Sequence, residues 1–402
     1  MARVLVTYGW CRSSYQATLA LALRGHDVYV CSCRRPAMAA WSRSSRAGAI
    51  VADPFALPEQ YVADVAEIVE RWAIDVILPG HEDALALQRG RSVVSEHVRI
   101  ACPSLEHLEL AVDKAAMTQV AAAAGITTPE SAFPTSPVEA LEAATRIGYP
   151  VVAKARRSNG GKGVFLANDE RALQEALEGP LAALTRRPET HPFVQRYVDG
   201  TIVGSAFLAR DGEVVATFGE RYLRSKDDAF GTSVLRERMD DEGLARTALR
   251  LAQSTRWTGI GHVDLIEERG TGHRYFLELN PRLWGAMHLA RINGFDFASG
   301  AVALALGELD LAPYFDRSPA SRRRSQWLVG EGIRAYVSLR KHGVAASGRA
   351  LIDMLRAIPR SRPDDFAWHE PWVLAAEAVC YAKGFVASRG DANPVTAGML
   401  GE

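Results

Sequence analysis

Short apolar runs alternate with helical patterns over the first hundred residues of the chain. The runs at 3–7 and 27–31 are rich in β-branched residues, and between them, over 13–24, Tyr15, Leu19 and Leu23 recur at helical spacing. A second helical pattern at 60–72 leads into an apolar run at 75–78, and a further short run follows at 97–102. Because strands alternate with helices, this part predicts a small parallel α/β domain.

The middle of the chain has a pattern that favours antiparallel pairing. Helices are predicted at 113–124, where Asp113 is a suitable N-cap, and at 137–146. A glycine-rich turn at 158–163 joins a strand at 151–154 to a run at 164–166, which predicts a hairpin with an exposed, flexible tip. Further strands are predicted at 193–198, 202–209, 213–219, 261–267 and 274–279. We therefore expect an α+β region here.

From about residue 316 the pattern becomes helical. Helices are predicted at 328–342, 345–358 and 370–385, after a basic run at 322–324 and before a tail rich in glycine, asparagine and proline. We favour a solvated helical face over contact with a membrane or an acidic partner, and expect the helices to cover the outer wall of a cleft or a dimer surface. The predicted division is an N-terminal α/β domain, two α+β subdomains and a helical extension, at 1–108, 109–192, 193–315 and 316–402.

Composition places the chain among ordinary globular proteins. Its 402 residues include 47 basic and 47 acidic side chains, and the zero net charge argues against a nucleic-acid binder. The five scattered cysteines favour a reduced, cytoplasmic protein, and neither a secretory signal nor a run of about 18 apolar residues is apparent. Only six of the 47 basic residues are lysine, so each lysine is a candidate for a specific role.

A lysine and a glycine-rich turn stand together in the first predicted hairpin. Alternation in Val151-Val-Ala-Lys154 places Lys154 on a strand, and the turn Arg156-Arg-Ser-Asn-Gly-Gly-Lys-Gly163 follows it. Glycine lets backbone amides approach phosphate oxygens, and lysines supply positive charge. Neither the P-loop spacing nor, at Gly9 to Arg12, the dinucleotide-binding fingerprint is present. Taken alone, the hairpin is equally consistent with a phosphate site and with a merely mobile turn.

Three side chains with oxygen ligands are expected to converge on neighbouring strands. Asp264 precedes Glu278 by fourteen residues, and Asn280 follows two residues later. Residues two apart on a strand project to the same face, and Asp264 on a neighbouring strand can join them. The alternative is a solvated strand face, but Leu277 and Leu279 alternate as an opposite, buried face. We favour a site for Mg²⁺, which takes oxygen ligands and completes its coordination with waters and substrate phosphates.

The order of these features resembles the ATP-grasp family over roughly residues 1–312. In that family an N-terminal α/β domain precedes two α+β subdomains that hold ATP between them. The resemblance implies that Lys114 and Lys154 are the two nucleotide lysines, that the metal ligands are Asp264, Glu278 and Asn280, and that the cofactors are ATP and Mg²⁺, with Mn²⁺ as a substitute. The other implied nucleotide-binding residues are Ser158, Gly160, Gly161, Lys162 and Gly163 around the phosphates, and Gln195, Arg196, Tyr197 and Val198 beside adenine.

The chain departs from the family at the ribose. A glutamate that usually follows the glycine of the hinge strand is replaced here by Thr201-Ile202, so binding of the ribose hydroxyls by a carboxylate is in doubt. This departure keeps open the hypothesis of a nucleotide-binding module without catalysis.

A finer resemblance, to carboxylate–amine ligases of the superfamily, lies in Asn280-Pro-Arg-Leu-Trp-Gly-Ala-Met-His288. It implies that Arg282 steadies the reacting phosphoryl or tetrahedral centre and acts with Lys154 in catalysis. It also implies that Trp284 and Gly285 lie near the substrate cleft, although core packing explains Trp284 and His288 equally well.

Several further polar residues are weighed as substrate ligands. Arg221 and Arg224 are suited to holding a substrate carboxylate, and a surface ion pair explains them equally well. Glu82, in a loop that follows a predicted strand, is a candidate for positioning an amine. Asp83 is expected to be structural, and His262 is treated as a strand histidine outside the site.

The functional hypothesis is therefore an ATP-dependent carboxylate–amine ligase. A carboxylate attacks the γ-phosphate, and an amine displaces phosphate from the acyl phosphate, so the partners are two small molecules rather than nucleic acid or membrane, and a homodimer is allowed. Two alternatives remain open. One is another ATP-grasp activity, either a bicarbonate-activating carboxylase or a kinase, and the other is the non-catalytic module.

Overall fold

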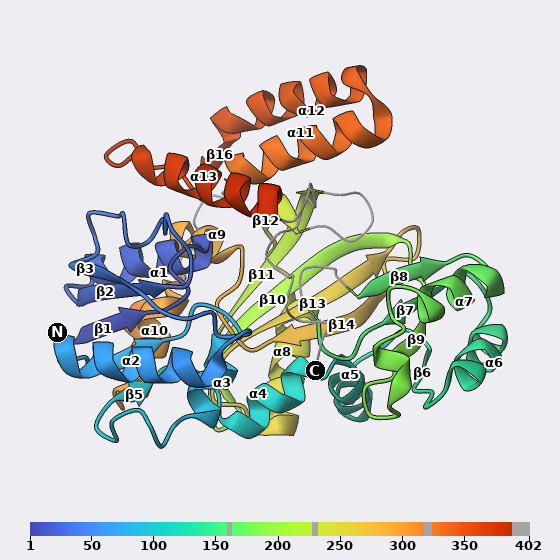
Figure 1. Cartoon of the computed structure of the whole chain (residues 1–402), viewed down its shortest axis with the longest axis horizontal. Coiled ribbons are helices and arrows are strands. Elements are labelled where there is room, and N and C mark those ends of the chain that lie inside the picture. The colour runs from blue at the N-terminus through green and yellow to red at the C-terminus, as the bar shows by residue number, and fades with distance from the viewer. Residues whose placement is uncertain (159–162, 227–231, 317–323, 388–402) are drawn as a thin grey trace.

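The computed structural model describes residues 1–158, 163–226, 232–316 and 324–387. Three sheets organise this part of the chain, with five, four and seven strands. In Figure 1 the five-stranded sheet lies at one end, the four-stranded sheet at the other, and the long strands of the seven-stranded sheet run between them. The predicted combination of α/β and α+β parts is confirmed.

The N-terminal sheet is parallel and has the order β3-β2-β1-β4-β5. Its strands are β1 (Arg3–Val6), β2 (Asp27–Ser32), β3 (Ala47–Ile50), β4 (Val76–Leu78) and β5 (Arg99–Ile100), and its helices are α1 (Arg12–Leu23), α2 (Pro58–Trp72), α3 (Asp83–Arg89) and α4 (Leu105–Val112). The apolar stripe of α2 packs against Leu5 and Ile77 of the sheet. Ligand-binding groups of such sheets lie beyond the carboxyl ends of the strands, where the loops after β1 and β4 are found.

The four-stranded sheet is antiparallel and has the order β6-β9-β7-β8. It contains β6 (Ser131–Ala132), β7 (Val151–Lys154), β8 (Val164–Ala167) and β9 (Phe193–Arg196), and it is accompanied by α6 (Pro137–Ile147), α7 (Glu170–Glu178) and the 3₁₀ turn η1 (Leu184–Arg186). The helix α5 (Lys114–Ala123) precedes it and begins at Asp113, whose side chain accepts from two backbone amides. β9, which follows the predicted boundary at residue 192, pairs with β7 in this sheet.

The seven-stranded sheet has the order β14-β13-β10-β11-β12-β15-β16. It is formed by β10 (Gly200–Arg210), β11 (Glu213–Ser225), β12 (Ser233–Arg238), β13 (Gly259–Glu268), β14 (Arg274–Asn280), β15 (Arg324–Gln326) and β16 (Ser361–Pro363). The helices α8 (Glu242–Thr255), α9 (Met287–Ile292) and α10 (Phe297–Ala305) and the turn η2 (Ala312–Tyr314) complete this region. The sequence pattern predicts neither β12 nor α8.

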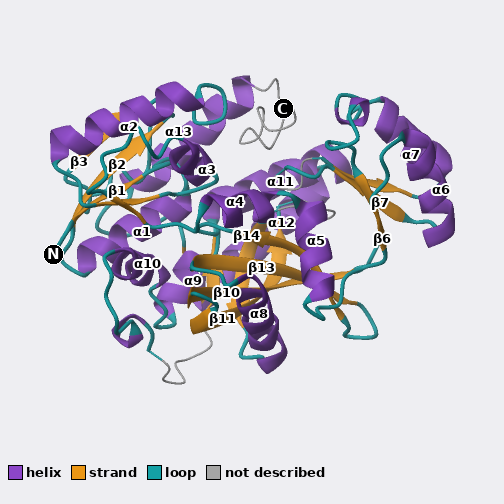
Figure 2. Ribbon diagram, turned by 90° about the horizontal axis from the view of Figure 1, so that it is seen from below, coloured by secondary structure: helices purple, strands orange, loops and turns teal. Residues whose placement is uncertain are grey.

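Alternation along these strands separates an apolar face from a polar one. Val263, Leu265 and Leu279 share a core with α5 and α8, which Figure 2 shows gathered around the strands. A bulge between Asp264 and Leu265 shifts the register of β13 against β14. Leu265 and Val263 are therefore paired with Phe276 and Leu279, which are both buried. Leu277 is only half-buried, so the prediction that Leu277 and Leu279 both lie on the buried face is wrong.

The C-terminal extension, defined as residues 324–387, contributes strands as well as the predicted helices. Its helices are α11 (Leu328–His342), α12 (Val344–Ala357) and α13 (Trp372–Ala387), with the turn η3 (Ile358–Arg360) before β16. β15 pairs with β12, and β16 pairs with β15 in parallel, so the extension widens the central sheet. In the described residues, no helix combines the length and apolar character needed to cross a bilayer.

Candidate functional site

Asp264, Glu278 and Asn280 lie together on the polar face of the large sheet. Asp264 of β13 is paired directly with Glu278 of β14. The Nδ2 atom of Asn280 lies 3.0 Å from Asp264 Oδ2 and 3.3 Å from Glu278 Oε1. The three side chains therefore lie on one face, with the amide nitrogen of Asn280 donating to both carboxylates and its oxygen accepting from Arg282.

The donor set fits a hard divalent cation. Within the described ranges no group of three histidine, cysteine, aspartate or glutamate side chains is arranged to hold a metal ion. A cation between Asp264 and Glu278 would gain the amide oxygen of Asn280 as a ligand if that amide turned over, because its nitrogen faces the carboxylates in this structure. Two carboxylates and an amide leave positions for waters and phosphate oxygens, which is the coordination that Mg²⁺ prefers. Burial raises the pKa of Asp264 to about 6, against the neighbouring charge of His262.

Two lysines lie near this acidic group, Lys114 at the start of α5 and Lys154 in the small sheet. Lys114, the first residue of α5, places Nζ 3.2 Å from Glu278 Oε2 and also donates to the carbonyl of Ser158. Burial favours a higher pKa of Glu278, but the charge and hydrogen bond of Lys114, together with Arg282 and Asn280, outweigh burial and lower the pKa. Lys154, at the end of β7, donates from Nζ to Gln195 Oε1 at 2.6 Å, and burial lowers its pKa to about 8.

The strand predicted to contact adenine is already engaged through part of its backbone. The amides of Arg196 and Tyr197 donate to the carbonyls of Glu130 and Pro150 at 2.8 and 3.2 Å. The Arg196 guanidinium pairs with Glu268 at 3.2 Å, and Val198 is buried. Hydrogen bonds to adenine would therefore come from the backbone carbonyls of this segment and from the backbone around Val198. The Gln195 side chain accepts a hydrogen bond from Lys154.

Arg282 connects the N-terminal domain to the acidic group. Its Nε donates to Glu82 Oε1 at 3.1 Å, and its Nη2 donates to Asn280 Oδ1 at 3.2 Å. Glu82 precedes α3 at the carboxyl end of β4, so the loops of the parallel sheet reach the face of the large sheet here. Asp83 instead accepts from the hydroxyls of Thr7 and Tyr61 inside the N-terminal domain, which is the structural role expected of it.

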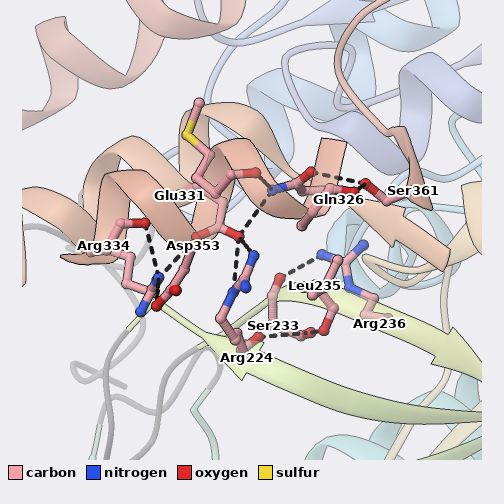
Figure 3. A network of polar contacts seen from close by, with 12 residues as sticks. Arg224, Ser233, Leu235, Arg236, Gln326, Glu331, Arg334, Asp353 and Ser361 are labelled. Carbon is pink, nitrogen blue, oxygen red and sulfur yellow. Dashed lines mark hydrogen bonds and ion pairs between the residues drawn. The ribbon is translucent and has the colours of Figure 1, made fainter. Parts of the chain in front are cut away.

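The other candidate substrate ligands are occupied within the protein. Arg221 Nη2 lies 2.7 Å from Glu267 Oε1, and Arg224 pairs with Glu331 of α11 (Figure 3). Ion pairing is thus the explanation that the geometry favours for both, and the partner of Arg224 is fully buried rather than on the surface. Gly160, Gly161 and Lys162, and the loop at 227–231, lie outside the described residues.

Trp284 and His262 stack beside the candidate site. Their ring centroids are 5.3 Å apart with an interplanar angle of 12°, and Trp284 is buried. His288 is buried against Gln16, at 2.9 Å from its Oε1, so core packing accounts for it. Trp284 therefore forms the wall behind His262, and Gly285 follows it in the loop.

His262, which the sequence analysis left outside the site as a strand histidine, lies beside Asp264, and Glu220 is a polar neighbour that the sequence analysis missed. His262 Nε2 lies 3.0 Å from Glu220 Oε1, and its Nδ1 lies 3.8 Å from Asp264 Oδ2. Burial favours a lower pKa of His262, but Asp264 and Glu220 outweigh it and raise the pKa. The period of two that placed Glu278 with Asn280 also places His262 with Asp264, so this signal was present in the sequence.

Comparisons with known proteins agree with this geometry. A family profile described as "Carbamoyl-phosphate synthase L chain, ATP binding domain" matches residues 113–202, which include Lys114 and Lys154. Over this segment the chain is similar to that ATP-binding domain, in agreement with the resemblance to ATP-grasp proteins seen in the sequence. Among curated relatives, the carbamoyl phosphate synthase large chain of Pyrococcus furiosus is 24% identical over 258 residues, which is 60% of this chain and 24% of that protein. The chain thus spans about a quarter of this relative's length.

Solved structures support the same fold. A biotin carboxylase–βγ-ATP complex from Campylobacter jejuni has a TM-score of 0.65 and 17% identity, over 77% of this chain and 72% of the other. The biotin carboxylase domain dimer of Hydrogenobacter thermophilus 2-oxoglutarate carboxylase, solved with MgADP, ADP and bicarbonate, has a TM-score of 0.64 and 17% identity, over 77% and 70%. At this identity the likeness concerns the fold alone.

Proposed function

We propose that the chain is an ATP-dependent ligase that activates a carboxylate as an acyl phosphate and joins it to a nitrogen nucleophile, with bicarbonate as the carboxylate best supported. The observation that carries the proposal is the 3.2 Å contact between Lys114 and Glu278. This contact places the ammonium group of Lys114, at the start of α5, beside the carboxylates of the large sheet. A metal-bound triphosphate needs both, because the carboxylates hold the metal and the lysines face the phosphates.

The described residues divide the work on the triphosphate. Lys114 and Lys154 would contact phosphate oxygens in place of Glu278 and Gln195, their present partners. Asp264, Glu278 and Asn280 would hold Mg²⁺, which neutralises charge on the transferred phosphoryl group. Since Lys154 is buried, its charge acts with little screening by water, and its electrostatic effect on transfer is correspondingly large.

The proposed chemistry has two balanced steps. An oxygen of the carboxylate attacks the γ-phosphorus, the bond to the β-phosphate oxygen breaks, and ADP leaves with that electron pair. A nitrogen nucleophile then attacks the carbonyl carbon of the acyl phosphate, loses a proton and expels inorganic phosphate. Arg282, held by Glu82 and Asn280, is placed to stabilise the oxyanion that forms in the second step.

Bicarbonate is favoured as the first substrate by the names of the related proteins. Carboxylases recur among the relatives, including pyruvate carboxylase of Bacillus subtilis, and one matching structure contains bicarbonate with MgADP. An organic carboxylate joined to an amine, the main hypothesis from the sequence, is the second candidate. Glu82 beside Arg282 supports it, because a carboxylate at this position can hold a cationic amine.

The test is MgATP-dependent ADP release with bicarbonate, amino acids and hydroxy acids, each alone and paired with ammonia or an amine. Product mass spectrometry identifies any new carbon–nitrogen bond. The proposal expects release that requires the carboxylate and is lost in Lys154→Met but kept in Lys383→Met, in which the altered lysine belongs to α13. Release that needs bicarbonate favours the first candidate, and release that needs an organic acid favours the second. No release with any acid, despite tight MgATP binding, would contradict the proposal.

A further inference from the structure

The loop 281–286, between β14 and α9, is held at both of its ends. At its start, Arg282 bonds to Glu82 and Asn280. At its end, the carbonyl of Gly285 accepts a hydrogen bond from Arg236 Nη1 at 3.0 Å. The position of Arg282 over the acidic group therefore depends on a second anchor, which lies on β12.

Arg236 is fixed in turn by Asp364 of the C-terminal extension. Its side chain is 1% exposed, and the same Nη1 that contacts Gly285 forms an ion pair with Asp364 Oδ2. Nη2 donates to the carbonyl of Ser233, and Figure 3 shows Arg236 on β12 facing the strands that carry Gln326 and Ser361. A buried guanidinium that loses its counter-charge is strongly disfavoured, so the contact of Arg236 with Gly285 requires Asp364.

Asp364 reaches the far side of the loop as well. It follows β16, and its amide donates to the carbonyl of Gln326 at 2.8 Å, which ties it to β15. Its own carbonyl accepts from Gln16 Nε2 of α1 at 2.6 Å. Gln16 Oε1 is 2.9 Å from His288 Nδ1 of α9, directly beyond the loop. Asp364 is thus linked to Gly285 through Arg236, and to α9 through Gln16.

We propose that Asp364 is a positioning residue, through which the C-terminal extension fixes the loop 281–286 and thereby holds Arg282 in place. The proposal rests on the proposed function only in assuming that the loop 281–286 faces the substrate. It assigns the extension a part in the site, in addition to covering the sheet. The expected consequence is that loss of Asp364 frees the loop without changing the nucleotide lysines, which lie on other elements.

Asp365 provides a matched control. It is as buried as its neighbour, but its two oxygens accept from the backbone amides of Leu328 and Val329 at 3.2 and 2.8 Å, at the start of α11. Asp365→Asn therefore removes a buried charge from the same segment without touching Arg236. A purely structural effect of the extension would appear in both variants.

The first measurement is hydrogen–deuterium exchange of peptides that cover 282–288 in the full chain without nucleotide. Asp364→Asn should accelerate exchange there by about tenfold or more, while Asp365→Asn leaves it near wild type. Should Asp364→Asn fail to fold, Asp364→Asn combined with Arg236→Met removes both charges and avoids an unpaired one. Exchange in 282–288 that stays at the wild-type rate in a folded variant, or rises equally in Asp365→Asn, would overturn the proposal.

The second measurement separates this proposal from the proposed function. With bicarbonate and ammonia as probes, Asp364→Asn should lower kcat/KM for bicarbonate by about tenfold or more, while the MgATP dissociation constant stays within about twofold. An equal loss of MgATP affinity would overturn the positioning role. If the wild type releases no ADP with these probes, the bicarbonate assignment fails, and the exchange data still decide whether Asp364 holds the loop.

Discussion

Replacing Lys154 by methionine should separate activity from stability. Lys154 is 8% exposed, and burial lowers the pKa of its ammonium from 10.5 to about 8. At about 1.36 kcal/mol per pH unit, this difference in pKa means that the charged ammonium of Lys154 destabilises the folded protein by roughly 3 kcal/mol at pH 7. Methionine removes that cost, but it leaves Gln195 Oε1 without its partner, at a penalty of about 1–2 kcal/mol. The net expectation is a protein stabilised by about 1–2 kcal/mol.

Activity should move in the opposite direction. The ammonium faces the triphosphate in the proposed complex, and removal of one such group typically costs about 10²–10³ in kcat. The assay is coupled ADP release at saturating MgATP, with thermal unfolding of the nucleotide-free protein at pH 7 as the stability measurement. A variant with wild-type kcat would refute the role of Lys154 in phosphoryl transfer. A variant that loses both activity and melting temperature would show that the lysine serves the fold instead.

Four further outcomes are expected. Glu278→Gln should lower kcat by about 10² or more and weaken the Mg²⁺ dependence, whereas Glu213→Gln, at the exposed start of β11, should not. Arg282→Lys, which cannot bond Glu82 and Asn280 as a fork, should lower kcat by about 10² with the KM for MgATP unchanged. In the wild type, kcat/KM for MgATP should fall as pH rises through about 8, where Lys154 loses its proton. Because Arg274 holds the pKa of Asp241 at about 2, unfolding assays should show this pair's stabilisation above about pH 4 and its loss as pH falls toward 2, and Asp241→Asn should lose less stability than the wild type over that range.

Much of the fold could be predicted because its strands alternate and its helices are capped. Asp113 does cap α5, and the runs at 3–7 and 27–31 do pair in parallel. The strand β12 escaped prediction because its sequence, Ser-Val-Leu-Arg-Glu-Arg, contains a buried arginine that sequence patterns assign to the surface. β15 and β16 are three residues each, too short to show a period, and they are strands only because β12 offers an edge to β15 and β15 offers one to β16.

The candidate site was predictable where it depends on local periodicity. Glu278 and Asn280 are two residues apart on one strand, so their common face follows from the sequence. The carboxylates that pair with Arg224 and Arg236 could not be predicted in this way. Glu331 is 107 residues from Arg224, and Asp364 is 128 residues from Arg236. Nothing local links the members of such pairs. The register shift after Asp264 could not be predicted either, since it depends on how two strands pair and not on either strand alone.

The most direct test of the central claim follows oxygen from the carboxylate into phosphate. The protein is incubated briefly with MgATP, a nitrogen nucleophile and ¹⁸O-labelled bicarbonate, and the released phosphate is analysed by mass spectrometry. Activation as an acyl phosphate predicts one ¹⁸O atom in each phosphate formed, because the attacking oxygen stays with phosphorus when the carbon–oxygen bond breaks. If bicarbonate stimulates ADP release but the phosphate carries no label, the carboxylate is not phosphorylated, and the proposed chemistry of the site is wrong.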